Sequence, residues 1–260
     1  MIKILKKAFW FPFSSKIQIE KYQKDIRDIE WNSFKKHIAN GVNFLDVGCG
    51  AGDNLNRAKT ELNCKVTGID PSPGEHGVGR FIENKTNEIH IIQGNAEDLP
   101  FKNEEFDIVF CSHVLEHVTN QTKSLKEIKR VLKKDGLVII GMPTASMTMI
   151  GLISHYLLTT HVNILFFIKH IGKKDMIDRF INIFLPKSHS YPNHRYIFHD
   201  LSAYRVSRWK KLISSKFIII KTITPCLYPY PDYIQFFPKI KNKKYSSSVF
   251  FICKIKSEDM

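Results

Sequence analysis

The fold of this 260-residue chain is decided by one stretch, Phe44-Leu45-Asp46-Val47-Gly48-Cys49-Gly50-Ala51-Gly52-Asp53-Asn54. Its apolar first half is typical of a buried parallel strand, and it ends abruptly in glycine. Gly48, Gly50 and Gly52 carry no β-carbon, so a ligand can approach the backbone of this turn closely. The helix predicted next directs its N-terminal amides and positive dipole end to the same place. Asp46 adds a fixed negative charge there, which favours a ligand with a cationic amino group over a phosphate.

The spacing of the glycines narrows the ligand class. A dinucleotide-binding turn reads G-x-G-x-x-G and would need its third glycine where this chain has Asp53. A glycine turn that only allows close packing of strand and helix is the alternative. The acid-x-G-x-G-x-G pattern resembles the first motif of the Rossmann-like (class I) S-adenosylmethionine (SAM)-dependent methyltransferases. Within that class, the chain is most similar to the families called methyltransferase type 11 and type 12. The resemblance covers roughly residues 42 to 144.

The resemblance implies an α/β fold with a seven-stranded, mostly parallel, doubly wound sheet and a helical and loop insertion after strand five. Strands are expected at 42–47, 64–69, 89–93, 106–111, 137–142, 217–224 and 249–255, the last two antiparallel. Helices are expected at 17–39 and from the glycine turn through about Leu62. Two more are expected at 122–134, with an Asp135-Gly136 C-cap, and at 200–215, with Asp200 as N-cap. We expect four parts: an N-terminal arm and helix, the SAM-binding core, an acceptor-side helical insertion, and a C-terminal helix with the last two strands (residues 1–40, 41–144, 145–199 and 200–260).

Further cofactor contacts follow from the resemblance. Asp70 ends the second strand, 18 residues beyond Gly52, where a carboxylate can accept both ribose hydroxyls of a bound nucleoside. A surface turn acid is the alternative for Asp70. The run 94–101 looks like the family's stretch beside the adenine, with Asn95 where an acid is usual. The predicted cofactor-binding residues are Asp46, Gly48, Cys49, Gly50, Asp70, Pro71, Asn95, Ala96, Glu97, Ser112 and His113.

Candidate catalytic residues follow the fourth strand. Ser112-His113-Val114-Leu115-Glu116-His117-Val118 resembles the family's strand-four ending, at the sheet edge where open α/β folds bind ligands. A hydroxyl acceptor must lose its proton, and histidine is the natural base near neutral pH. His113, His117 and His194 are the candidates, although His117 could instead be buried beside the cofactor without a catalytic role.

We predict no metal site. His189, His194 and His199 recur every five residues, a spacing that places them on neither one helix face nor one strand face. No cysteine or paired acid lies near them.

Charge is distributed unevenly along the chain. Residues 1–145 carry 21 basic and 19 acidic residues, whereas residues 146–260 carry 18 and 6. This concentration indicates an anionic surface or substrate. Residues 145–168 lack formal charge and predict a helical cap whose apolar face meets the core, a lipid or a lipid-like acceptor. The basic and aromatic segment 1–15 suits a membrane-interface anchor, with an arm packed on the domain as the alternative.

Five scattered cysteines, odd in number, argue against a disulfide framework and for a reducing compartment. We therefore expect a cytoplasmic protein, with attachment to the inner face of an anionic membrane as a further option. The predicted function is O-methylation of a sugar or lipid-linked glycan, with a histidine base and SAM as cofactor. The alternatives are methylation of a lipid or quinone-type small molecule, and a methyltransferase-like RNA-binding protein, although nucleic acid is disfavoured as a partner. The sequence makes no prediction of the oligomeric state.

Overall fold

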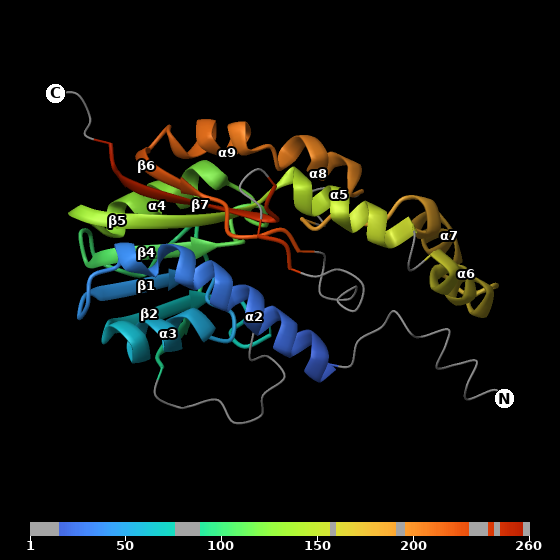
Figure 1. Ribbon diagram of the computed structural model, residues 1–260, viewed down its shortest axis with the longest axis horizontal. Coiled ribbons are helices and arrows are strands. Elements are labelled where there is room, and N and C mark those ends of the chain that lie inside the picture. Colours follow the sequence, from blue (N-terminus) through green and yellow to red (C-terminus); the bar gives the residue numbers. More distant parts are fainter. Residues whose placement is uncertain are drawn as a thin grey trace.

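The computed structural model describes residues 16–75, 89–156, 160–190, 196–228, 239–241 and 245–256. Within them, seven strands form one sheet in the order β3-β2-β1-β4-β5-β7-β6 (Figure 1). The predicted fold class is confirmed. The strands are β1 (Asn43–Val47), β2 (Lys65–Asp70), β3 (Ile91–Gln93), β4 (Phe106–Ser112), β5 (Leu132–Pro143), β6 (Phe217–Ile223) and β7 (Ser248–Ile255).

The pairing of the strands sets the position of the ligand crevice. β1 pairs in parallel with β2 on one side and β4 on the other, whereas β7 runs antiparallel to both β5 and β6. The chain therefore proceeds outward from β1 in one direction and then, after β3, returns to continue from β4 in the other. In such sheets ligands bind outside the carboxyl ends of the strands at this reversal.

Helices cover both faces of the sheet. They are α2 (Lys16–Phe34), α3 (Asp53–Leu62), α4 (Gln121–Val131), α5 (Ala145–Ser154), α6 (Thr160–Lys169), α7 (Met176–Phe184), α8 (Phe198–Ala203) and α9 (Val206–Ile213). One core cluster packs side chains of α4, α8 and α9 on the sheet, and a second packs side chains of α2 and α3. In Figure 1, α5, α6 and α7 extend away from the sheet. None of the helices in the described ranges is long and apolar enough to cross a bilayer.

Alternation along β1 explains both cores. Phe44 faces the α2 side, where its ring stacks on Phe110 and where Phe34 contacts Phe110 and Phe250. Leu45, the next residue, belongs to the core on the opposite face. A strand covered on both faces must be apolar where it is buried, and the buried residues of β1 other than Asp46 are Phe44, Leu45 and Val47. Asp46 is therefore the position in this strand that apolar packing does not explain.

Two predicted helix ends are wrong. Asp135-Gly136 does not cap a helix, because α4 ends at Val131 and fully buried Leu132 already pairs with Phe106 in the sheet. Asp200 does not cap a helix either. It lies inside α8, fully buried, and the predicted helix 200–215 is divided at Tyr204 into α8 and α9.

Candidate active site at the carboxyl end of the sheet

The glycine turn after β1 takes backbone conformations that glycine favours and packs closely on the segment after β4. Gly48, Gly50 and Gly52 all have positive φ, at 76°, 54° and 86°. A β-carbon on Gly48 would lie 2.1 Å from Cγ2 of Val114, so even alanine would force Val114 or the turn to move. Gly52 is the N-cap of α3, and the helix N-terminus therefore faces the turn.

Asp46 is a buried carboxylate beside this turn. Its side chain is almost inaccessible, and Oδ2 makes no hydrogen bond within the described residues. Burial raises the pKa of Asp46, and the neighbouring carboxylates of Asp70 and Asp53 raise that pKa further. The protein thus keeps an uncompensated acid at the end of β1. A bound cation would relieve the cost of burying it.

Asp70 lies at the end of β2 and shapes the turn. The N–H of Gly50 donates to Oδ2 of Asp70 at 2.8 Å, and the N–H of Ser72 donates to Oδ1 at 2.9 Å. Each carboxylate oxygen retains a second lone pair that could accept from a ligand hydroxyl. The structure therefore places Asp70 next to the glycine turn, where the sequence predicted it.

The other predicted cofactor contacts differ in what they offer. The Cys49 side chain packs on β2, because a β-carbon on Gly68 would lie 2.7 Å from its sulfur. Only the backbone of Cys49 is left for a ligand. Asn95 is exposed and Ala96 is buried. Glu97 accepts the backbone N–H of Asn120 at 2.9 Å, so its carboxylate holds the start of α4.

Two residues of this set hold the ends of neighbouring strands together. The carbonyl of Pro71 accepts from Nε2 of Gln93 at 3.1 Å, which links the loop after β2 to β3. The hydroxyl of Ser112 packs on β5, since a β-carbon on Gly141 would lie 2.5 Å from it.

These residues fit SAM on two independent observations. The amino acid part of SAM carries a cationic amino group, and Asp46 offers a buried carboxylate oxygen with no partner among the described residues. A nucleoside lying on the turn needs close backbone approach, and the three glycines of the turn, all with positive φ, place no β-carbon on that backbone. Asp70 would then hold the ribose hydroxyls.

His113 follows β4 in a strained conformation. Its φ is 56°, in the left-handed region that a non-glycine residue rarely adopts. Its N–H donates to the carbonyl of Gly141 at 2.9 Å, which fixes the backbone against β5. Such strain persists only where surrounding contacts impose it, and it concentrates at functional sites.

Glu116 gathers three imidazoles around one carboxylate. Its side chain is completely buried, and Oε1 lies 3.3 Å from Nδ1 of His113, 3.9 Å from Nε2 of His117 and 4.0 Å from Nε2 of His189. Burial alone would raise the pKa of Glu116, but the hydrogen bond from His113 and the proximity of His117 and His189 hold that pKa below its usual range. Glu116 is therefore an ionised acid among histidines.

The three imidazoles differ in exposure. His117 is 41% exposed, His189 is 27% exposed and His113 is 14% exposed. Burial lowers the pKa of His189 to about 4, despite the opposing effect of Glu116. His189 is therefore neutral near pH 7. Nε2 of His113 is buried and makes no hydrogen bond within the described residues.

His189 reaches this cluster because Asp200 holds the chain before it. Oδ2 of Asp200 accepts the N–H of His189 at 2.9 Å, and Oδ1 accepts the hydroxyl of Ser188 at 2.6 Å. Sequence reasoning missed Glu116 and His189 as site residues. Glu116 lies within the strand-four motif already quoted, but the long-range contact of His189 leaves no local signal.

Of the other histidines named in the sequence analysis, His199 is not in this cluster. His194 lies outside the described residues, so its predicted role stays a prediction. His199 is exposed, and its Nδ1 is 3.2 Å from the carbonyl of Tyr196.

The ligand atoms of His113, Glu116 and His189 lie within 4.8 Å of one another, a grouping that could hold a metal ion. In a tetrahedral site with bonds of about 2.1 Å, ligand atoms are about 3.4 Å apart. The 4.0 Å between His189 and Glu116 exceeds this spacing. The cluster would have to contract around an ion.

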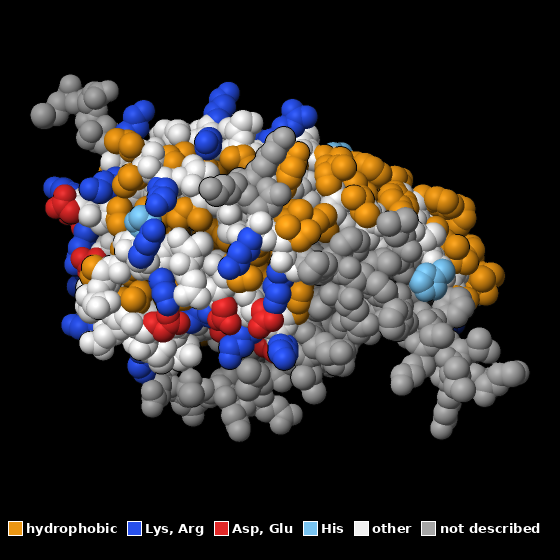
Figure 2. Space-filling model, viewed as in Figure 1, with side chains coloured by type: hydrophobic (Ala, Val, Ile, Leu, Met, Phe, Trp, Pro, Cys, Tyr) orange, Lys and Arg blue, Asp and Glu red, His pale blue; other side chains and the backbone are white. Residues whose placement is uncertain are grey.

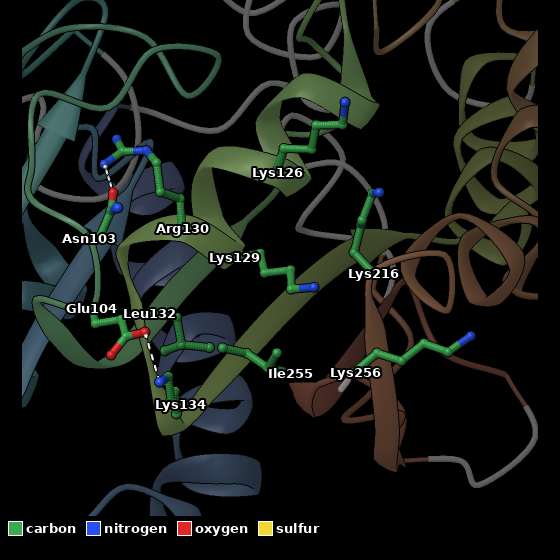
Figure 3. Close-up of a pocket in the computed structure, with 10 residues that line it drawn as sticks. All are labelled: Asn103, Glu104, Lys126, Lys129, Arg130, Leu132, Lys134, Lys216, Ile255 and Lys256. Carbon is green, nitrogen blue, oxygen red and sulfur yellow. Dashed lines mark hydrogen bonds and ion pairs between the residues drawn. The ribbon is translucent and has the colours of Figure 1, made fainter. Parts of the chain in front are cut away.

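A basic hollow of about 730 Å³ lies elsewhere on the molecule, at the opposite end of the strands. Figure 3 shows lysines from α4, β5 and the ends of β6 and β7 around it. Among them, Lys134 lies 3.8 Å from Glu104. This hollow is not part of the cofactor site, because the glycine turn, Asp70 and His113 all lie at the carboxyl ends of the parallel strands.

Comparison with known proteins agrees with this geometry. Residues 45–140 match the family model described as a methyltransferase domain. A demethylmenaquinone methyltransferase of Staphylococcus haemolyticus is 36% identical over 106 residues, which are 40% of this chain and 44% of that protein. A tRNA U34 carboxymethyltransferase of Campylobacter curvus is 36% identical over 122 residues, 44% of this chain and 41% of that protein.

A similar fold occurs in a SAM-dependent methyltransferase of Thermotoga maritima, described as a possible histamine N-methyltransferase. The TM-score is 0.51 at 18% identity, and the match covers 93% of this chain and 100% of the other. The fold, the glycine turn and the family match together define a Rossmann-like SAM-dependent methyltransferase domain. This chain carries that domain at residues 45–140. It spans half or less of the length of the first curated relatives it matches.

Proposed function

We propose that the chain transfers the methyl group of SAM to an oxygen of an amphipathic acceptor, a sugar or lipid-linked glycan. The observation that carries this proposal is the buried Glu116 carboxylate facing three imidazoles at the end of β4. A hydroxyl acceptor must give up its proton as it attacks, and an imidazole beside a carboxylate can take it, whereas a neutral amine attacks with its own lone pair.

When bound, SAM supplies an electrophilic methyl group on a positively charged sulfur. Asp46 would bind its amino group and Asp70 would bind its ribose hydroxyls. The nucleoside would lie against the backbone of the glycine turn. The protein need not stabilise new charge at sulfur, because the sulfonium charge disappears during transfer. Its task is to hold acceptor oxygen, methyl and sulfur in line.

The base that we propose is His113, positioned by Glu116. Oε1 of Glu116, 3.3 Å from Nδ1 of His113, would accept from that nitrogen, which leaves Nε2 to accept the acceptor's proton. Nε2 would take the hydroxyl proton while the acceptor oxygen receives the methyl group that bound SAM supplies. Neutral His189 and half-exposed His117 can hydrogen-bond the other polar groups of the acceptor.

The insertion supports an amphipathic acceptor. The segment from α5 to α7 is largely apolar and leads directly into the loop that carries His189. A sugar would meet the histidines, while an attached lipid would find apolar side chains along the helices that precede them.

The first test is calorimetric titration of S-adenosylhomocysteine into the wild-type protein, with NADH in a parallel cell. We expect binding of S-adenosylhomocysteine, lost in Asp46→Asn and in Asp70→Ala. Transfer of radiolabelled methyl from SAM would then be measured into soluble sugars and into lipid-linked glycans. Binding of NADH alone would contradict the cofactor, and label in lipid but never on oxygen would contradict the acceptor atom.

A second candidate is methylation of a lipid-like quinone, and the match to a demethylmenaquinone methyltransferase favours it. That reaction would place the methyl group on ring carbon. Mass spectrometry of the labelled product distinguishes the two, because an O-methyl ether and a C-methyl group fragment differently.

The RNA-binding alternative has its own observation, the basic hollow of Figure 3. If it held, charge reversal of Lys216 and Lys256 would weaken RNA binding and lower its salt dependence. The same variants should leave methyl transfer to a small acceptor unchanged.

A further inference from the structure

Large apolar side chains are exposed together on α5, α6 and α7. Of the sixteen large hydrophobic residues exposed within the described residues, eleven lie between Met149 and Leu185. Figure 2 shows hydrophobic side chains gathered at the end of the molecule that these helices form. Patches of this extent on a folded domain mark a surface that meets another apolar phase.

Each helix contributes one stripe. The exposed residues of α7 are Ile177, Phe180 and Phe184, three and seven positions apart, which places them on one helix face. Helical spacing also places three exposed residues of α6 on one face, and likewise three exposed residues that start on α5 and continue just past its end. These are Ile164, Leu165 and Ile168, and Met149, Ile153 and Tyr156.

The stripes are held in a fixed arrangement. Nε2 of buried His155 lies 3.1 Å from the carbonyl of Ile183, and the hydroxyl of Tyr156 donates to the carbonyl of Phe184 at 2.6 Å. The rings of Phe167 and Phe180, whose centroids are 5.3 Å apart, join α6 to α7. The exposed residues therefore belong to a packed unit.

Basic residues border the apolar stripes. Between Lys169 and Lys187 the chain has five basic and two acidic residues, and one acid, Asp175, is paired with Arg179 at 2.7 Å. Lys169, Lys173 and Lys174 are exposed around the turn from α6 to α7. No formal charge occurs from residue 145 to residue 168.

We propose that α5, α6 and α7 form a docking surface for a lipid bilayer with anionic headgroups. The apolar stripes would enter the interfacial region and the lysines would meet the phosphates, which is the arrangement of interfacial helices. α5 and α6 have 10 residues each, whereas a crossing helix needs about 20. The helices would therefore lie in the interface.

The positive charge around the α6–α7 turn favours an anionic lipid bilayer over a second copy of the chain. A symmetric dimer through this face would bring the lysines of the α6–α7 turn close to their own copies, with few acids to pair them. An anionic bilayer instead neutralises each lysine while covering the apolar residues.

The test is co-sedimentation of the full chain with vesicles of phosphatidylcholine, with and without phosphatidylglycerol. We expect binding to the mixed vesicles that weakens with salt. The double variant Ile168→Glu, Ile177→Glu should reduce partitioning about tenfold or more. Its matched control is Ile218→Glu, Ile220→Glu, because those side chains are 52% and 54% exposed on β6 and should leave partitioning unchanged.

A second pair of variants tests the charge. Lys173→Glu, Lys174→Glu should lose about tenfold of the binding to anionic vesicles, whereas the exposed pair Lys210→Glu, Lys211→Glu on α9 should not. Every variant is checked for folding by its melting temperature and its binding of S-adenosylhomocysteine. Failure of the wild type to bind either vesicle would overturn the proposal. So would a dimer in solution that the Ile168, Ile177 variant converts to a monomer.

Discussion

Nδ1 of His113 lies 3.3 Å from the buried carboxylate of Glu116, three residues later in the chain. The pair can form because His113 has a positive φ, which turns the chain as it leaves β4. An acid that accepts from one ring nitrogen fixes the tautomer and presents the other nitrogen as a base. A local backbone distortion thus brings together two residues that would be separated on a regular strand.

Replacing Glu116 by Gln should slow methyl transfer to a hydroxyl acceptor by about a hundredfold, because the amide cannot stabilise the protonated imidazole. Affinity for S-adenosylhomocysteine should stay the same. The rate–pH profile is the decisive measurement, since loss of Glu116 should shift its rising limb to lower pH. An unchanged profile would leave Glu116 a purely structural role. Glu104→Gln, at an exposed acid, is the control.

Replacing Asp46 by Asn should stabilise the protein at pH 7 while abolishing cofactor binding. The raised pKa of Asp46 means that the folded state holds an acid at a cost that is present above its unfolded pKa. Removing the charge should therefore raise the unfolding free energy by about 1 kcal/mol or more. Denaturant melts and calorimetry measure the two effects. A destabilised variant that still binds cofactor would contradict the assignment.

Gly48→Ala and Gly41→Ala distinguish the cost of backbone strain from the cost of a steric clash. Both glycines have φ above 70°, but a β-carbon on Gly41 meets nothing within 4 Å, whereas one on Gly48 meets Val114 at 2.1 Å. Gly41→Ala should cost about 1 kcal/mol for backbone strain alone. Gly48→Ala should cost several times more and impair binding of S-adenosylhomocysteine. Equal melting temperatures for the two variants would show that the turn adapts.

His189 should make the free energy of unfolding depend on pH between about pH 4 and pH 6.5. Its pKa is about 4 in the folded protein and about 6.5 when unfolded, so the unfolded chain takes up a proton first as pH falls. The stability due to neutral His189 is complete above about pH 6.5 and is lost progressively toward pH 4. His189→Gln should reduce the slope of unfolding free energy against pH by about one proton in this range. His199→Gln, at an exposed site, should not.

Chelation should leave methyl transfer unchanged. Although His113, Glu116 and His189 could be drawn around an ion, the separation of His189 from Glu116 suits a hydrogen-bonded network better than a closed metal site. The measurement compares turnover before and after dialysis against EDTA, with metal content determined in parallel. Activity that disappears and returns with a stoichiometric metal would contradict a metal-free base.

The cofactor half of the site was predictable because its residues lie in short motifs. Asp46 and the glycines follow one strand, Asp70 ends the next and His113 follows a third. Parallel strands bring their carboxyl ends to one edge, so predicting the sheet also predicts that these residues meet. For these residues, the position in the sequence therefore determines the position in the structure.

The half of the site that we propose for the acceptor was harder to predict. His189 is placed by Asp200, which looked like a helix cap but accepts hydrogen bonds across a loop. The end of α4 was mispredicted because Asp135-Gly136 has the chemistry of a cap, whereas the burial of Leu132 draws the chain into the sheet earlier. In both places tertiary contacts overrode local preference. The three helices of the insertion have apolar residues on outward faces, so their pattern could not indicate how they pack.

The exposed Phe184 and the site residue His189 are only five positions apart, and the link between them is short and anchored at Asp200. A surface that holds Phe184 would therefore also set the distance of the Glu116–histidine cluster from the membrane. Under that arrangement, turnover would follow the density of acceptor within the lipid plane and would fall when acceptor is diluted with inert lipid. The amount of acceptor per volume of solution would cease to govern the rate.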